Sequence, residues 1–511
     1  MPDTFFADNS DDCHRAASGP PVRQQGAAAS ACRHERRRAW LTLFVVLTAA
    51  CAMNPATGRR QFSLMSEEEE LQIGQQQDAE IRRGMGAYDD GALQQYIGDV
   101  GLRLARLSER PRLPWQFTIV DAPAINAFAL PGGYIYVTRG ILPFLDDEAQ
   151  LAGVLGHEIG HVTARHAVQQ YSKSMGADLG VLLGSLFVPE ARPFGQLAES
   201  GLGVLMLKYG RDDELEADRL GVRYASRGGW DPDAMPRMLA MLARIEDATD
   251  KRGVPNWLST HPSPANRIEQ VQAAIQQADA TTRAVNRDDY LRRIDGVVYG
   301  DNPEQGIVRR TTFLHPKLRF KMEFPDGWDV NNGQTQVVAK EPGVNAFMVL
   351  QPIAPSAGGT IEAAALRSMQ QAGFTAVEGG ATTINGLTAF VATYQGTMRD
   401  LGRVGVRAAH IVHDGRMYLV AGVAPMPIYY RVEATFSQSL RAFQPTTRAE
   451  VEGIRPSRVT LYTARAGDTW QSIADREGHG AIKPATLAIM NNRAPSEPPR
   501  AGERMKIVVS G

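Results

Sequence analysis

The chain has very little cysteine, and none in its main body. The three cysteines are Cys13, Cys32 and Cys51, so residues 52–511 hold no thiol. This absence excludes a disulfide-stapled secreted fold and any cysteine-ligated zinc site in that part of the chain. An excess of charge is missing as well, because 55 Lys and Arg stand against 56 Asp and Glu. Nucleic-acid-binding proteins usually have a basic excess, so we expect no nucleic-acid partner.

Long hydrophobic runs are also missing from the sequence. The apolar stretch 41–50 is far shorter than the roughly 20 residues that a membrane-spanning helix needs. The remaining composition, with 43% hydrophobic and 22% charged residues, is that of an ordinary globular protein. A length of 511 residues indicates several domains, since one domain usually takes about 100–200 residues.

Residues 1–50 are expected to form an unstructured extension and an export signal. Arginines precede the apolar run, which ends Leu-Thr-Ala-Ala before Cys51. This resembles a bacterial lipoprotein signal, although Thr48 stands where such signals usually have Leu. The resemblance implies lipidation of Cys51. Because Ala52 follows in place of Asp, it also implies a periplasmic protein anchored at the outer membrane of a Gram-negative bacterium. The alternative is cleavage by an ordinary signal peptidase beside a chance cysteine.

The clearest chemical motif is His-Glu-Ile-Gly-His at residues 157–161. Apolar periodicity predicts one helix over 147–171, and positions i and i+4 of a helix share a face. His157 and His161 can therefore present their imidazoles to one metal ion. Glu158 is offset by one residue, so it can approach a water at the metal without binding the metal. The motif is specific, but alone it also fits an ordinary amphipathic helix.

A catalytic zinc also needs a third protein ligand and one open position. Residues 209–218 read as the start of a second helix, which is predicted to run to about Arg227 and to be ended by two glycines. Glu214 and Asp218 share a face of it, so one carboxylate can ligate zinc and the other can receive the outer N–H of a ligating histidine. Glu216 is a rival third ligand, but it lies about 200° around the helix from Glu214. We expect Glu216 to face solvent.

These two motifs together resemble the HtpX-like and BepA-like zinc metallopeptidases of metallopeptidase family forty-eight. The resemblance covers residues 60–275, and it includes the segment 126–133 and the dipeptide His261-Pro262. It implies one Zn²⁺ per chain, with Glu214 as the third ligand and Asp218 as the supporting carboxylate.

The resemblance implies peptide-bond hydrolysis with Glu158 as the general base. A second hydrogen-bond donor to the oxyanion is usual, and His261 and Tyr209 are the candidates. His261 can instead occupy the open metal position in a resting state, or only form a turn with the proline after it. His166 is off the ligand face, and we expect it to be structural.

The substrate is expected to bind in an extended conformation. Residues 125–130 and 134–138 read as paired strands, and an edge strand there can bind a substrate backbone by β-augmentation. This predicts endopeptidase action on unfolded polypeptides. The glycine-rich stretch 175–207 predicts either buried helices that flank a lid or plain core. The candidate substrate-binding residues are Asn126, Ala127 and Phe128.

The last fifty residues resemble a LysM domain. Two short predicted helices lie between a strand near 459–462 and a strand near 505–509, with Asp468 as the expected helix N-cap. The resemblance implies binding to peptidoglycan. The alternative is a LysM-shaped spacer without sugar affinity. Between residue 290 and this module, alternating strands predict an α+β domain of unknown role, with hairpin turns at the Asp-Gly or Asn-Gly pairs 326–327, 385–386 and 414–415.

The sequence as a whole predicts an α+β multidomain protein. Its leading function is an exported zinc endopeptidase that acts on unfolded or misassembled envelope proteins. The alternative is a non-catalytic envelope scaffold with a closed, structural zinc site. The expected parts are an extension and export signal (1–50), a mainly helical zincin-type metallopeptidase domain with a small β-sheet (51–275), a linker (276–289), the α+β domain (290–445) and the LysM-like βααβ module (446–511).

Overall fold

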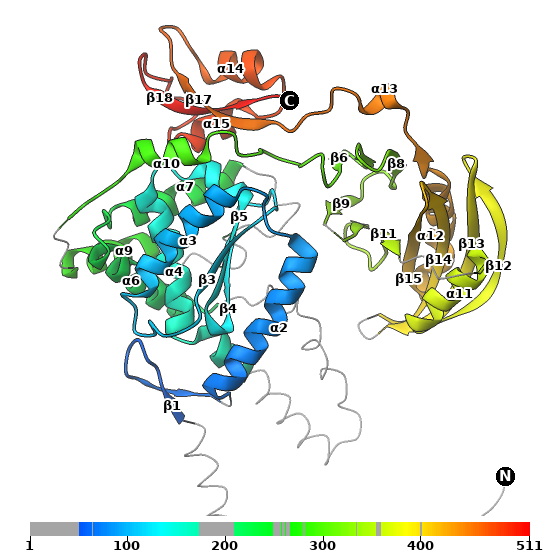
Figure 1. Cartoon of the computed structure of the whole chain (residues 1–511), viewed down its shortest axis with the longest axis horizontal. Coiled ribbons are helices and arrows are strands. Elements are labelled where there is room, and N and C mark those ends of the chain that lie inside the picture. Colours follow the sequence, from blue (N-terminus) through cyan, green and yellow to red (C-terminus); the bar gives the residue numbers. More distant parts are fainter. Residues whose placement is uncertain are drawn as a thin grey trace, which may run out of the picture. The chain divides into compact units, whose positions relative to one another are not determined.

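The computed structural model shows an α+β protein with a largely helical N-terminal region and a large sheet-rich region after it (Figure 1). The structure describes residues 51–63, 65–172, 209–248, 257, 261, 266–278, 282–333, 335–353, 359–398 and 401–511. The predicted lid segment 175–207 lies outside these residues. Among the described residues, no helix is both long enough and apolar enough to cross a membrane.

The N-terminal region is built around a three-stranded sheet in the order β3-β5-β4. The middle strand β5 is parallel to β3 and antiparallel to β4, which confirms the predicted strand pair. Figure 1 shows the sheet between α2 on one side and α3 and α4 on the other. The bounds are β1 (Cys51–Met53), β2 (Arg60–Phe62), α2 (Glu67–Met85), α3 (Gly91–Ala105), β3 (Gln116–Val120), β4 (Ala127–Leu130), β5 (Tyr134–Thr138) and a 3-10 helix (Arg139–Phe144).

Helix α4 (Glu148–Thr163) carries the His-Glu-Ile-Gly-His motif, and Asp147 caps it by accepting a hydrogen bond from the Gln150 N–H. The predicted helical stretch at 147–171 is largely confirmed, with one break. The chain leaves the helix at Ala164 and Arg165, where Arg165 has a left-handed φ of 58°, and it is helical again over 166–172. Long-range contacts hold this break, because Arg165 donates to the Glu70 carboxylate at 2.9 Å and to a backbone carbonyl at 3.0 Å.

Helix α6 (Arg211–Arg227) ends at the predicted position, and it packs directly on α4. Small residues at helical spacing make this close approach possible. A methyl group built at Gly160 would lie 2.9 Å from the Ala217 carbonyl oxygen, and one at Gly156 would lie 3.1 Å from the backbone of Gly221. The remaining helices of this region are α7 (Ala234–Ala248), α9 (Arg267–Gln277) and α10 (Arg287–Ile294).

Beyond α10 the chain forms a seven-stranded antiparallel sheet and a separate four-stranded sheet. The predicted hairpin turns at 385–386 and 414–415 join paired strands. The predicted hairpin at 326–327 is wrong, because β8 and β9 on either side belong to different sheets. The elements are β6 (Ile307–Arg309), β7 (Thr312–His315), β8 (Phe320–Glu323), β9 (Asp329–Asn332), β10 (Val337–Lys340), β11 (Phe347–Ile353), α11 (Ile361–Gln371), β12 (Phe374–Ile384), β13 (Leu387–Met398), β14 (Gly402–His413), β15 (Arg416–Pro425), α12 (Met426–Arg441), β16 (Gln444–Pro445) and α13 (Arg448–Val451).

The C-terminal module has the expected strand–helix–helix–strand order, with its two strands antiparallel. Its first helix is capped by Thr469, which accepts from the Ser472 N–H, and not by the predicted Asp468. Asp468 instead accepts hydrogen bonds from Tyr462 and from the Arg465 N–H. The LysM assignment stays a prediction. The module consists of β17 (Arg458–Thr463), α14 (Trp470–Ile473), a π-helical turn (Ala474–Gly478), α15 (Pro484–Met490) and β18 (Arg504–Val509).

One hydrophobic core connects the N-terminal region with the C-terminal module. Tyr290 and Ile294 of α10 and Trp470 and Ile473 of α14 belong to the same buried cluster as α3, α4 and α7. Helix α10, near the predicted boundary at residue 290, thus contributes side chains to this core. The seven-stranded sheet has core clusters of its own.

Candidate metal centre

Four potential metal ligands, from α4, from α6 and from the segment at residue 261, meet in one buried group. Ligand atoms of His157, His161, Glu214 and His261 all lie within 4.8 Å of one another, and all four residues are buried. The predicted ligands are therefore brought together by the packing of α4 on α6.

Their spacing fits a tetrahedral zinc site. Ligand atoms about 2.0–2.1 Å from zinc lie about 3.3 Å from each other in a tetrahedron. The two histidine Nε2 atoms are 3.0 Å apart. Each also lies 3.5 Å from a Glu214 oxygen. The donor set of two imidazoles and one carboxylate is that of a zinc hydrolase.

Asp218 holds the outer side of His157. Its Oδ1 lies 2.8 Å from His157 Nδ1, so His157 Nε2 is free to face the cluster. Arg267 binds the same carboxylate through Nε at 2.7 Å and Nη2 at 2.9 Å, and it also lies 3.1 Å from Glu214. Burial alone would raise the pKa of Asp218, but Arg267 and His157 outweigh it and hold this pKa at about 2. Asp218 is therefore an anion that fixes the His157 tautomer.

Glu158 lies beside the four ligands, with its Oε1 3.5 Å from His261 Nε2. It is fully buried, and neither of its carboxylate oxygens has a hydrogen-bond partner among the described residues. Burial raises its pKa to about 7, although nearby His261 lowers it in part. A carboxyl group that titrates near neutral pH can both accept and release a proton.

His261 and Tyr209 both reach the cluster. His261 Nδ1 is 3.1 Å from a Glu214 oxygen and 3.3 Å from His157 Nε2, so it stands at the distance of a fourth ligand. The Tyr209 ring stacks on His161 with a 3.9 Å centroid distance. The indole of Trp257 stacks on His261 at 4.3 Å.

The expectation that Glu216 faces solvent holds only in part, because the residue is half-buried and its Oε2 lies 3.0 Å from Nε2 of His166. His166 in turn contacts the outer nitrogen of His161. Sequence reasoning also missed Arg267 and Trp257. Nothing in their local pattern indicated a site, since each reaches the cluster only through tertiary packing.

The candidate substrate-binding residues lie at one edge of the sheet. Strand β4 is an edge strand that packs on α4. Asn126, Ala127 and Phe128 are buried, and the Phe128 ring stacks on Tyr136 at 4.9 Å. The structure thus places this edge next to the metal-ligand helix, and a role in substrate binding stays a prediction.

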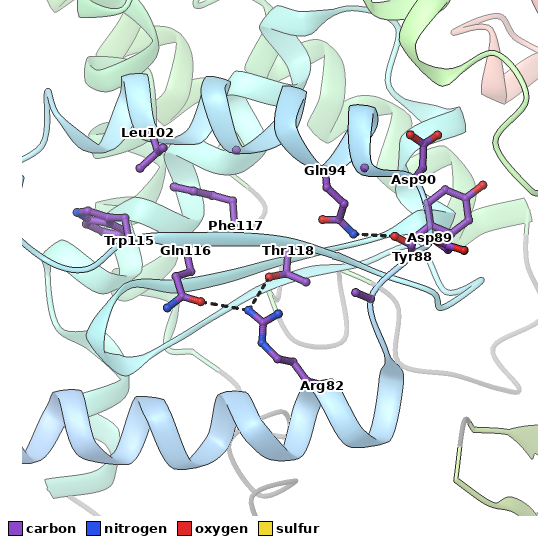
Figure 2. Close-up of a pocket in the computed structure, with 13 residues that line it drawn as sticks. Arg82, Tyr88, Asp89, Asp90, Gln94, Leu102, Trp115, Gln116, Phe117 and Thr118 are labelled. Atoms are coloured by element: carbon purple, nitrogen blue, oxygen red, sulfur yellow. Dashed lines mark hydrogen bonds between the residues drawn. The ribbon is translucent and has the colours of Figure 1, made fainter.

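A separate open pocket lies between α2, α3 and β3, away from all candidate site residues (Figure 2). Its polar side chains bond to the protein itself. Arg82 reaches Gln116 and Thr118, and Gln94 binds the backbone carbonyls of Tyr88 and Ile119. These internal bonds leave no cluster of groups there with an evident chemical purpose.

Comparison with known proteins agrees with the geometry. The profile of peptidase family M48 matches residues 92–275. The chain is 31% identical over 247 residues to the beta-barrel assembly-enhancing protease of Escherichia coli K12, covering 47% of this chain and 50% of the relative. It is 30% identical over 231 residues to the mitochondrial metalloendopeptidase OMA1 of Schizosaccharomyces pombe, covering 44% of this chain and 66% of the relative. The chain thus spans about half the length of the bacterial relative. The match over residues 92–275 and these relatives identify a metallopeptidase domain of the M48 type in this chain.

Proposed function

We propose that this chain is a zinc-dependent endopeptidase that cleaves unfolded or extended polypeptides in the quality control of bacterial envelope proteins. The observation that carries the proposal is the buried group of His157, His161, Glu214 and His261, with the carboxylate of Glu158 beside it and without a hydrogen bond among the described residues. A general base at a metal centre of this composition is the arrangement that peptide hydrolysis needs.

In this proposal His157, His161 and Glu214 hold one Zn²⁺. The metal supplies a Lewis acid that polarises the substrate carbonyl and makes a water more acidic. Asp218 keeps His157 in the ligating tautomer, and Arg267 balances the negative charge of the two carboxylates.

Glu158 performs the proton transfers. It accepts the proton of the attacking water and delivers that proton to the leaving amine. Because its pKa is raised to about 7, both directions cost little near neutral pH. The phenol of Tyr209 is the candidate donor to the carbonyl oxygen, since burial raises its pKa and keeps it protonated.

His261 has two possible roles that experiment can separate. At its present distances it fits a fourth ligand, which closes the site until the ring withdraws. As an oxyanion donor it must stay near the metal during the reaction. His261→Ala is expected to increase proteolysis in the first case and to decrease it in the second.

The proposal also covers the substrate class and the location. Edge strand β4 offers a backbone to an extended substrate, and β-augmentation reads little sequence. The export signal and the name of the bacterial relative support an envelope substrate. The proposal further includes a lipid on Cys51, a position at the outer membrane, and binding to peptidoglycan through residues 446–511.

The direct test uses Glu158→Gln in the purified full chain. The variant is expected to keep its zinc content and to lose cleavage of casein, because Gln cannot accept the water proton. Glu269→Gln is the matched control, since Glu269 is an exposed residue on α9. Undiminished cleavage by Glu158→Gln would refute the mechanism.

Two further assays address the location. Fatty-acid labelling in cells should be lost in Cys51→Ala, and an unlabelled wild type contradicts the anchor. The full chain should sediment with purified peptidoglycan, and absence from the pellet removes wall binding. The scaffold alternative predicts a zinc-loaded chain without proteolysis, and similarity to proteases does not favour it.

A further inference from the structure

The two histidines on α4 have different outer partners. His157 Nδ1 lies 2.8 Å from a carboxylate oxygen of Asp218. His161 Nδ1 instead lies 2.9 Å from Nδ1 of a third imidazole, that of His166. The nitrogen of a metal-ligating histidine that faces away from the metal usually donates to a carboxylate or a carbonyl. The partner of His161 therefore needs an explanation.

The direction of these hydrogen bonds follows from the chemistry of the imidazole ring. His161 Nε2 faces His157 and Glu214, so a ligating His161 carries its proton on Nδ1. Two ring nitrogens 2.9 Å apart can bond only when one donates and the other accepts. His166 Nδ1 is thus the acceptor. Its own proton sits on Nε2, which lies 3.0 Å from Glu216 Oε2.

The protein places His166 there by breaking the helix. On an unbroken helix, a residue five positions after His161 would lie about 140° around the axis. The break at Ala164 and Arg165 changes that direction, and buried Glu70 holds Arg165 in it. His166 is fully buried as a result.

His161, His166 and Glu216 thus form a hydrogen-bonded series, which we call the relay. Its end at Glu216 is fixed in place as well. Glu216 lies on α6, the same helix that supplies Glu214. Its carboxylate also accepts from Asn54 Nδ2 at 3.4 Å, and Asn54 is itself buried in a tight turn. Glu216 Oε2 lies 3.0 Å from Nε2 of His166, so the carboxylate is aimed at that ring.

We propose that His166 and Glu216 are positioning residues that hold His161 in the tautomer and ring orientation that bind the metal. They do for His161 what Asp218 does for His157, but through one additional imidazole. The proposal rests on the proposed zinc site. Loss of such an outer partner usually weakens metal binding by about 10–100-fold.

Two substitutions of His166 separate the ends of the relay. In His166→Asn the side-chain oxygen can replace Nδ1 as the acceptor for His161, but the link to Glu216 is lost. In His166→Gln the amide can still reach Glu216, but no acceptor remains for His161. We therefore expect His166→Gln to weaken zinc binding by about 10–100-fold and His166→Asn by less.

The experiment measures transfer of zinc alone from the purified full chain to a chromophoric chelator. Glu216→Leu removes the acceptor of His166 and is expected to weaken binding by about 10-fold. Asp212→Asn, at an exposed position of the same helix, is the control and should leave zinc binding unchanged. The increase in melting temperature on zinc addition is measured for each variant. A merely structural role lowers the melting temperatures of the apo and loaded forms equally, whereas the relay role reduces the difference between them.

The outcomes distinguish the relay from the proposed activity, because zinc transfer needs no substrate. If wild type binds zinc and His166→Gln binds it equally tightly, the relay is refuted while the metal site stands. If zinc binding falls in His166→Gln more than in His166→Asn, the relay is supported even where no proteolysis is found. A wild type that binds no zinc overturns both proposals.

Discussion

The close contact of α4 with α6 leads to a prediction about Gly160. In Gly160→Ala the new methyl group would lie 2.9 Å from the Ala217 carbonyl oxygen and 3.0 Å from Ala217 Cα. Both are backbone atoms, so they cannot rotate away as a flexible side chain can. The two helices must therefore move apart by a few tenths of an ångström.

The magnitude can be worked out against a matched control on the same helix. At Gly153 the nearest atoms to a new methyl group belong to Met235 and lie 3.8 Å away, which is an ordinary contact. Gly153→Ala is therefore expected to stabilise the protein by about 0.5–1 kcal/mol, because alanine favours the helix. Gly160→Ala has the same helix gain, but overpacking costs about 1–3 kcal/mol. The two variants should differ by about 1–3 kcal/mol in the free energy of unfolding.

Activity should respond more strongly than stability. Glu214 is on α6 and the two histidines are on α4, so separation of the helices distorts the metal centre directly. A misplacement near 1 Å can cost about 100-fold in rate, and a few tenths of an ångström should cost about 10-fold. Urea unfolding of the apo protein, zinc competition and casein cleavage measure the three effects. Equal stability, zinc affinity and rate in Gly160→Ala and Gly153→Ala would refute the packing argument.

Three other predictions follow from buried groups and from the metal. Lys506 is fully buried and donates to the Leu145 carbonyl at 2.7 Å and to Asp146 at 3.1 Å. In urea titrations, Lys506→Met should therefore lower the free energy of unfolding by about 3 kcal/mol. An unchanged midpoint of unfolding would contradict this prediction. Burial lowers the pKa of His410 from 6.5 to about 4, so the unfolded chain binds a proton between these pH values that the folded chain does not. The contribution of neutral His410 to the free energy of unfolding should be fully present above pH 6.5 and fall by about 3 kcal/mol as the pH drops to 4. Calorimetry of His410→Leu should show a shallower fall of the free energy of unfolding over this pH range. Removal of zinc with a chelator should lower stability by about 2.7 kcal/mol relative to zinc at 100 times its dissociation constant, and a melting temperature independent of zinc would argue against the site.

The ligand pairs could be predicted because helical spacing is a local property. His157 and His161, and likewise Glu214 and Asp218, are four residues apart, so each pair shares a helix face wherever the helix lies. Glycine and alanine at the facing positions then allow these two helices to approach closely. Neither pair alone shows that the helices pack together, and that step came from the family resemblance.

The supporting groups around the site could not be predicted, because they depend on distant contacts. His166 contacts His161 only because the helix breaks at Arg165, and the break depends on Glu70 from another helix. Arg267 reaches Asp218 from α9 across a long stretch of sequence. Helical periodicity therefore placed His166 on the wrong side.

The sheet-rich region shows the same limit on strand pairing. Asn385 and Asp414 occupy tight turns between strands that are antiparallel neighbours. Asp326 precedes a glycine with a φ of 78°, yet the flanking strands enter different sheets. Turn chemistry determines how the chain reverses, whereas the partner of each strand is determined by the packed core.

Zinc content is the most direct test of the central claim, which is that α4 and α6 together hold one catalytic metal ion. Elemental analysis of the purified full chain should find one zinc per chain. His157→Ala and Glu214→Ala should each lose the metal, while Glu158→Gln should keep it. A wild type that takes up no zinc, or a Glu214→Ala variant that binds zinc as tightly as wild type, would contradict the account.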